Sequence, residues 1–240
     1  MGMRRATVAA AVIAALLLLL AGPGVRLGLW TFRLGFSMLR WGAYLGLAAA
    51  VVALLQLLWR RTRGPSPWPL LGALVLGLIA VGVPWYWQRL AERVPPIHDI
   101  STDTQDPPLF VAVLPLRAGA PNAATYGGDS VAMAQKQAYP DIGPLELAGA
   151  TPGAAFDRAL AAARHAGWAI VAADSAEGRI EATATTGWFG FKDDVVIRIR
   201  PDGSASRIDV RSVSRVGGSD VGTNARRIRS YLRRVAEPNG

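Results

Sequence analysis

Three uncharged apolar segments dominate the N-terminal part of the chain, at residues 6–22, 41–59 and 68–87. A transmembrane helix needs about 20 predominantly apolar residues, within a range of roughly 17–25. Because lipid offers no hydrogen-bond partner to a bare backbone, each segment is predicted to cross a bilayer as an α-helix. The first segment follows Met-Gly-Met-Arg-Arg, so a secretory signal peptide is the alternative there, although no Ala-x-Ala cleavage site follows it.

The distribution of charge supports a membrane anchor. The net charge of +9 would by itself suggest a nucleic-acid partner. However, residues 1–94 contain ten arginines and one glutamate, whereas residues 95–240 contain sixteen basic and sixteen acidic side chains. The excess positive charge therefore flanks the apolar segments, as is typical of membrane proteins, and no nucleic-acid partner is predicted.

The arginines also bear on orientation. Arg60, Arg61 and Arg63 lie in the short loop between the second and third segments. Short loops rich in arginine favour the cytoplasmic side. The arginines of the anchor divide five against five between the two sides, so the reverse orientation is the alternative. Because of the short loop, residues 1–94 are predicted to be an anchor that starts on the cytoplasmic side and leaves the C-terminal domain on the opposite one.

The remainder of the chain has two parts. Residues 95–138 are rich in Pro, Ala and Gly and predict an extended linker and a long loop. Residues 139–236 show regular patterns, with strands expected at 145–147, 168–173, 179–186, 195–200 and 206–213, and helices at 152–166 and 219–236. The order β-α-β-β-β-β-α predicts an α+β domain, with an antiparallel sheet and two helices packed on one face.

Catalytic candidates are few. The chain has no Cys, which excludes disulfides, thiol nucleophiles and thiolate metal sites, and neither a metal nor a cofactor is predicted. His98 stands beside Asp99 and Asp103, a combination that could supply the general base of a hydrolase. The alternative is a polar linker in which these side chains form local turns.

A second candidate site lies late in the chain. The ligand-binding residues predicted there are Arg211, Ser212, Ser214, Arg215, Ser219, Asp220 and Asn224. Two arginines that leave a strand just before a helix N-terminus are suited to binding an anion. The alternative is internal: Ser219 or Asp220 caps the helix, and Asp220 pairs with Arg215.

The last predicted helix carries arginines on its outer side. Arg226, Arg229 and Arg233 are predicted to contact the anionic headgroups of the membrane. The alternative is a solvated helix whose cations are favoured near its C-terminus.

Four segments carry a resemblance: Pro95-Pro-Ile-His-Asp-Ile-Ser-Thr-Asp, Tyr139-Pro-Asp-Ile-Gly-Pro-Leu, Trp188-Phe-Gly-Phe-Lys-Asp-Asp-Val-Val-Ile-Arg and the stretch 209–229. Over residues 95–235 the chain resembles the bacterial domain-of-unknown-function family numbered 1499. The resemblance implies association with a membrane or cell envelope, and it brings no established activity or catalytic residues.

These observations together predict a membrane-tethered binding or interaction module of the bacterial cell envelope. It would be a multi-pass protein of the inner membrane with its C-terminal domain on the periplasmic side. The expected partners are the lipid bilayer and an anionic lipid or small anionic ligand. An envelope hydrolase that uses His98 with Asp99 or Asp103 is the alternative.

Overall fold

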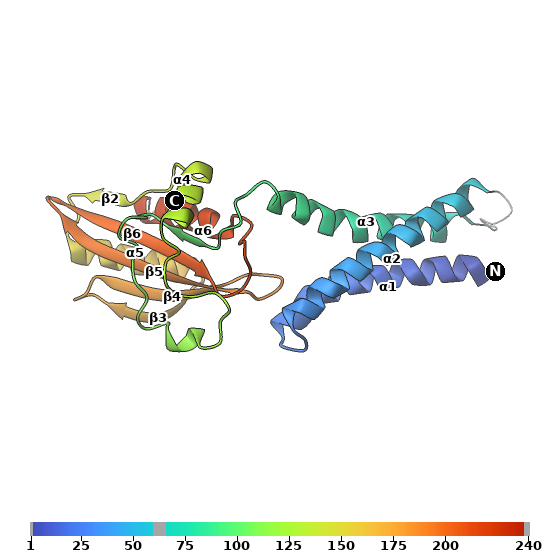
Figure 1. Ribbon diagram of the computed structural model, residues 1–240, viewed down its shortest axis with the longest axis horizontal. Coiled ribbons are helices and arrows are strands. Elements are labelled where there is room, and N and C mark those ends of the chain that lie inside the picture. Colours follow the sequence, from blue (N-terminus) through green and yellow to red (C-terminus); the bar gives the residue numbers. More distant parts are fainter. Residues whose placement is uncertain (1, 60–65, 238–240) are drawn as a thin grey trace. The chain divides into compact units, whose positions relative to one another are not determined.

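The computed structural model describes residues 2–59 and 66–237, and the chain divides into two compact units (Figure 1). One unit is Met1–Glu92 together with Gly187–Gly190, and the other is Arg93–Thr186 together with Phe191–Gly240. Arg60, Arg61 and Arg63, on which the predicted orientation depends, lie outside the described residues.

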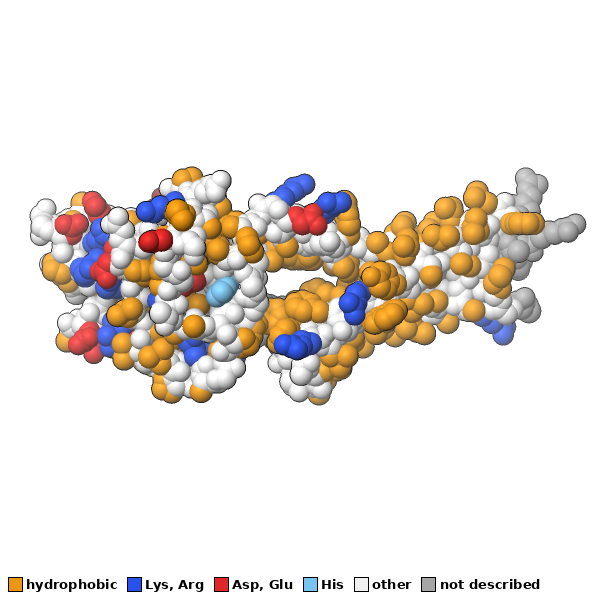
Figure 2. All heavy atoms as spheres, in the orientation of Figure 1, with side chains coloured by type: hydrophobic (Ala, Val, Ile, Leu, Met, Phe, Trp, Pro, Cys, Tyr) orange, Lys and Arg blue, Asp and Glu red, His pale blue; other side chains and the backbone are white. Residues whose placement is uncertain are grey.

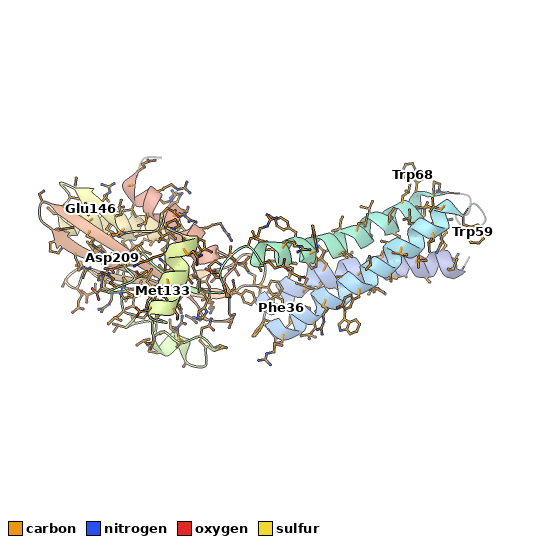
Figure 3. All side chains as sticks on the ribbon, turned by 45° about the horizontal axis from the view of Figure 1, so that its top comes forward. Phe36, Trp59, Trp68, Met133, Glu146 and Asp209 are labelled. Carbon is orange, nitrogen blue, oxygen red and sulfur yellow. The ribbon has the colours of Figure 1, made fainter. Side chains whose placement is uncertain are left out.

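The first unit contains three long helices, α1 (Gly2–Arg26), α2 (Phe32–Leu58) and α3 (Trp68–Ala91). Each is long and apolar enough to cross a membrane. Apolar side chains cover much of their surface (Figure 2). Trp59 and Trp68 point outward at the same end of this unit (Figure 3), where aromatic side chains are expected to meet the lipid headgroups.

Small residues bring the helices together. A Cβ atom added to Gly46 of α2 would lie 2.7 Å from the Cβ of Ala80 in α3, so this crossing tolerates no larger side chain. The buried amide of Gln56 in α2 donates a 2.7 Å hydrogen bond to the hydroxyl of Thr7 in α1. Close packing and a polar contact therefore both fix the bundle.

The second unit is an α+β domain. Its strands are β1 (Asp99–Ser101), β2 (Leu145–Ala148), β3 (Ala169–Asp174), β4 (Arg179–Thr185), β5 (Lys192–Asp202) and β6 (Ala205–Ser214). Its helices are α4 (Asp129–Ala138), α5 (Pro152–His165), α6 (Thr223–Ala236) and the short 3-10 helix η1 (Pro115–Arg117). The sheet is antiparallel in the order β1-β6-β5-β4-β3, and β2 also pairs with β6.

The predicted fold class is confirmed, with additions. Thr151 caps α5 as expected, accepting the Ala154 N–H. β1, η1 and α4 were not predicted, and all three lie within residues 95–138. β1 is too short to show an alternating pattern, and α4 carries few large apolar residues. α6 begins at Thr223, four residues later than expected, because residues 219–222 form its capping turn.

The two faces of the sheet are covered differently. On the helix face, α5 and α6 pack over residues such as Ile180, Ile197 and Ile208. On the opposite face, which we call the loop face, Phe110 and Val113 of the segment 107–124 contact Val196 and Val213. This segment runs across the sheet in Figure 1. Both faces of the central strands are therefore covered where these residues lie.

Candidate functional site

The loop face of the sheet holds buried charged side chains. Side chains alternate along a strand, so the residues between the apolar positions of β4, β5 and β6 point away from the helices. Glu181, Asp194, Asp209 and Arg211 occupy these positions, and each is 0 % exposed. A buried charge is tolerated only when it is paired and hydrogen-bonded, so their partners define what this face can do.

The guanidinium of Arg211 is buried and bonded to groups within the protein. Its guanidinium donates to both carboxylate oxygens of Asp99, at 3.0 and 2.8 Å, and to the carbonyls of Pro108 and Ala124. The rings of Phe110 and Tyr126 lie 5.1 and 5.3 Å from it. Burial raises the pKa of Asp99 more than the hydrogen bond and charge of Arg211 lower it. The pair therefore fastens β1 and the segment 107–124 to β6.

Asp194 joins two further arginines. Its carboxylate accepts from Arg117 at 2.6 Å, from Arg215 at 2.8 and 2.9 Å, and from the hydroxyl of Thr183 at 2.7 Å. Burial acts to raise the pKa of Asp194, but the hydrogen bonds from Arg215, Thr183 and Arg117 outweigh it and the pKa is lowered. Arg215 also donates to the carbonyl of Leu116. This cluster thus holds the η1 region against the sheet.

Glu181 binds backbone rather than a ligand. Its carboxylate accepts the N–H groups of Val111, Ala112 and Val113 at 3.0–3.1 Å. Arg179 lies 3.2 Å from the same carboxylate. Successive N–H groups that converge on one anion form a favourable, charge-assisted contact. A single buried side chain of β4 therefore fixes the backbone of this loop at Val111–Val113.

A more exposed network lies farther along the loop face. It joins Asp103, Asp106 and Asp209 with Arg198, Arg200 and Arg207. Figure 3 labels Asp209. Burial opposes ionisation of Asp103, but the N–H groups of Asp106 and Gln105 and the charges of Arg207 and Arg198 prevail and lower its pKa. Three acidic and three basic groups compensate one another here.

The structure does not gather the predicted anion-binding residues into one site. Arg211 and Arg215 lie on the loop face, whereas Ser212, Ser214 and Asn224 hydrogen-bond one another beside α6. The internal partner expected for Arg215 was Asp220; its observed partner is Asp194, because the strand alternation directs Arg215 to the loop face. Anion binding by this set stays a prediction.

Asp220 and its neighbours have a structural role. Asp220 accepts the N–H groups of Gly222, the N-cap residue of α6, and of Asn224 in its first turn, at 2.8 and 2.7 Å. Burial raises the pKa of Asp220 above its ordinary value. Ser219 accepts the Val221 N–H and contacts the carbonyl of Pro95 at 3.5 Å.

Both acidic hydrolase candidates are paired with arginines. Asp99 is bound to Arg211, and Asp103 to Arg207 and Arg198. The carbonyl of His98 accepts from Ser214 and Asn224. Within residues 2–59 and 66–237, no group of three or more acidic or histidine side chains is placed to hold a metal ion.

The outer arginines of α6 share one side of the helix. Arg226 and Arg233 are exposed, and Arg229 is partly so. Arg229 forms a two-point ion pair with Asp141, and its hydrogen bond lowers the pKa of that carboxyl. Arg226 donates to the carbonyl of Val221 and the hydroxyl of Thr223. The side chain predicted to be most available to an anion is therefore that of Arg233.

One exposed surface was missed by the sequence analysis. Among the described residues of the α+β domain, the exposed large apolar side chains are Leu109, Val111, Leu114, Leu116 and Met133. The first four come from one loop, and we call them the apolar ridge. In the sequence, the feature that could have indicated this surface is the uncharged, largely apolar run of residues 107–116 between Asp106 and Arg117.

These features define a class: an α+β domain with an antiparallel sheet, preceded by three helices that could cross a membrane. The family model described as "Protein of unknown function (DUF1499)" matches residues 99–235, from the start of β1 to the last turn of α6. The chain belongs to this family. Comparison with curated proteins gives no match.

Proposed function

We propose that this protein is a membrane-tethered interaction module whose soluble domain works at the surface of the bilayer that anchors it. The carrying observation is the short connection between the two units. α3 ends at Ala91 and β1 begins at Asp99. Even fully extended, residues 92–98 span at most about 25 Å, which is less than the thickness of a bilayer. A tether this short gives the domain a high effective concentration at the membrane.

The tether is also fixed at its domain end. The carbonyl of Ile97 accepts the Asp220 N–H at 3.1 Å, and the carbonyl of His98 accepts from Ser214 and Asn224 at 2.9 and 3.0 Å. Three residues that were expected to bind an anion, Ser214, Asp220 and Asn224, thus hydrogen-bond the end of the tether instead. These contacts shorten the free part of the tether and support a function close to the membrane.

The proposed ligand class is an anionic lipid or a small anionic molecule. Because Arg211 and Arg215 are occupied by Asp99 and Asp194, the contact falls to the outer arginines of α6. Of these, Arg233 is exposed, and Arg226 donates only to a carbonyl and a hydroxyl, so no carboxylate compensates its charge. Both guanidinium groups can therefore attract an anionic ligand.

The module can be tested by cutting the tether after reconstitution. A protease site placed between Glu92 and Pro95 would release the domain from full-length protein held in vesicles. We expect the cut domain to remain with the vesicles during flotation, and release from vesicles of every lipid composition would contradict the proposal. An Arg226→Glu/Arg229→Glu/Arg233→Glu variant, with a salt series, reports how much of the retention depends on α6.

We further propose that the domain lies on the periplasmic side of a bacterial inner membrane, on the strength of the arginines in the short sequence between the second and third apolar segments. The chain has no Cys, so a single Glu146→Cys substitution on the exposed side of β2 gives one label site. A membrane-impermeant maleimide is expected to label it in spheroplasts. Labelling only after lysis would place the domain in the cytoplasm.

An envelope hydrolase centred on His98 is less favoured. Both carboxylates that would assist the imidazole are bound by arginines, and Asp99 is almost fully buried. An orienting carboxylate must reach its imidazole at about 2.6–3.2 Å, and Asp99 instead places both oxygens on Arg211.

A further inference from the structure

The apolar ridge is an unusual surface for a soluble domain. Leu109 is 73 % exposed, Val111 51 %, Leu114 46 % and Leu116 53 %. Single exposed apolar residues are common, but a group of four from one short segment marks an interaction surface. We propose that the ridge enters the headgroup region of the anchoring bilayer. This inference rests on the proposed function and names the part of the domain that meets the membrane.

The ridge is held rigidly from behind. Phe110 and Val113, which alternate with its residues, are buried against Val196 and Val213 of the sheet. Glu181 fixes the backbone at Val111–Val113 from the sheet side. A surface that is already ordered loses little conformational entropy when it binds, so a shallow insertion is favoured.

The backbone of the ridge suits a lipid environment. In a bilayer every N–H group needs a partner within the protein. Pro107, Pro108 and Pro115 have no N–H, and the N–H groups of Val111, Ala112 and Val113 are bound by Glu181. The Leu114 N–H lies 3.4 Å from the carbonyl of Val111. The three N–H groups that Glu181 binds face the sheet while the apolar side chains of the ridge are exposed, and that arrangement favours an apolar partner for this part of the loop.

The loop that carries the ridge is attached near the tether that leads to the membrane anchor. Asn122, at the end of this loop, donates to the carbonyls of Ser214 and Gly217. Ser214 in turn donates to His98 at the end of the tether. The loop and the tether are thus fastened to the same end of β6. Insertion of the ridge would extend a membrane contact that the three apolar helices already provide.

The ridge lies on the loop face and α6 on the helix face, on opposite sides of the sheet. A domain that rests on its ridge directs the arginines of α6 toward water, so of the two ligand classes proposed above only the small anionic molecule would meet them. A domain that rests on α6 does the reverse, so the two contacts can be told apart by labels on the two faces.

Single-Cys variants of the full-length chain provide the test. Leu114→Cys on the ridge, Arg233→Cys on α6 and Glu146→Cys on β2 would each carry a fluorophore, in vesicles of phosphatidylcholine with and without lipid-borne quenchers. All three positions are exposed, so the fold should tolerate the changes. We expect the quenchers to remove most of the emission at Leu114→Cys and little at the other two, independently of salt.

A matched pair of variants probes the chemistry. With the label moved to Val111→Cys, Leu116→Asp should abolish quenching because a carboxylate resists entry into lipid, whereas Leu116→Met should preserve it. Quenching at Arg233→Cys alone would overturn the ridge assignment and leave the proposed function standing. Quenching at no position would overturn both. Shielding at Leu114→Cys that grows with protein density and without quenching would assign the ridge to a second copy and overturn the inference.

Discussion

Replacing Arg211 with alanine is expected to lower the free energy of unfolding of the α+β domain by about 3–5 kcal/mol, because it leaves the carboxylate of Asp99 buried without its partner. The substitution also frees the carbonyls of Pro108 and Ala124 and removes the cation that stacks on Phe110 and Tyr126. Pulse proteolysis of the full-length protein across a urea series would measure the loss as a midpoint lower by roughly 2 M.

Two further variants make this prediction specific. Arg207→Ala removes a partly exposed arginine from the outer network, where an ion pair contributes about 1 kcal/mol or less. An Asp99→Leu/Arg211→Met double variant removes both buried charges and should recover much of the loss, since replacing a buried pair with apolar residues is often close to neutral. Equal midpoints for Arg211→Ala and Arg207→Ala would contradict the account. An Arg211 variant is therefore a poor probe of ligand binding, because any effect on a ligand would be confused with loss of the fold.

Replacing Glu181 with glutamine is expected to destabilise the domain by about 2–4 kcal/mol and to loosen the loop that carries the apolar ridge. A glutamine has one acceptor oxygen in place of two, and its NH₂ group would face the N–H groups of Val111–Val113. Hydrogen exchange followed by mass spectrometry should show faster exchange in the peptide that spans residues 109–117.

The matched control for Glu181 is Glu177→Gln. Glu177 also pairs with Arg179, but its side chain is 60 % exposed. We expect a change within about 0.5 kcal/mol and unchanged exchange in the 109–117 peptide. If Glu181→Gln behaved in the same way, the loop would owe its shape to the Phe110 and Val113 contacts and to the bonds made by Arg117, Arg211 and Arg215.

Local pattern was enough to predict the three apolar helices, the antiparallel strands and the cap of α5. It failed where the partners are far apart in sequence. Val111 and Glu181 are 70 residues apart, and Arg117 and Asp194 are 77 apart. The alternation in β6 predicts that Asp209 and Arg211 lie on the face opposite the core, and such a face is normally exposed to solvent. Both side chains are buried, because a loop from far away in the sequence covers that face. The apolar ridge could not be predicted for the same reason. Its residues are exposed only because Phe110 and Val113 of the same loop are buried against the sheet, and the sequence does not show that contact.

The pairing of β1 with β6 has a consequence for how the protein is made. Asp99 enters the sheet opposite Val213, so the first strand of the domain has no partner until almost the whole chain has been synthesised. At about 5–20 residues per second, the ribosome needs roughly 6–23 s to produce the intervening sequence. During that interval the apolar helices can already enter the membrane, whereas Asp99 lacks Arg211 until β6 has been made. A ribosome that stops before β6 would leave an inserted anchor with an unfolded domain, which is a natural substrate for membrane-bound proteases.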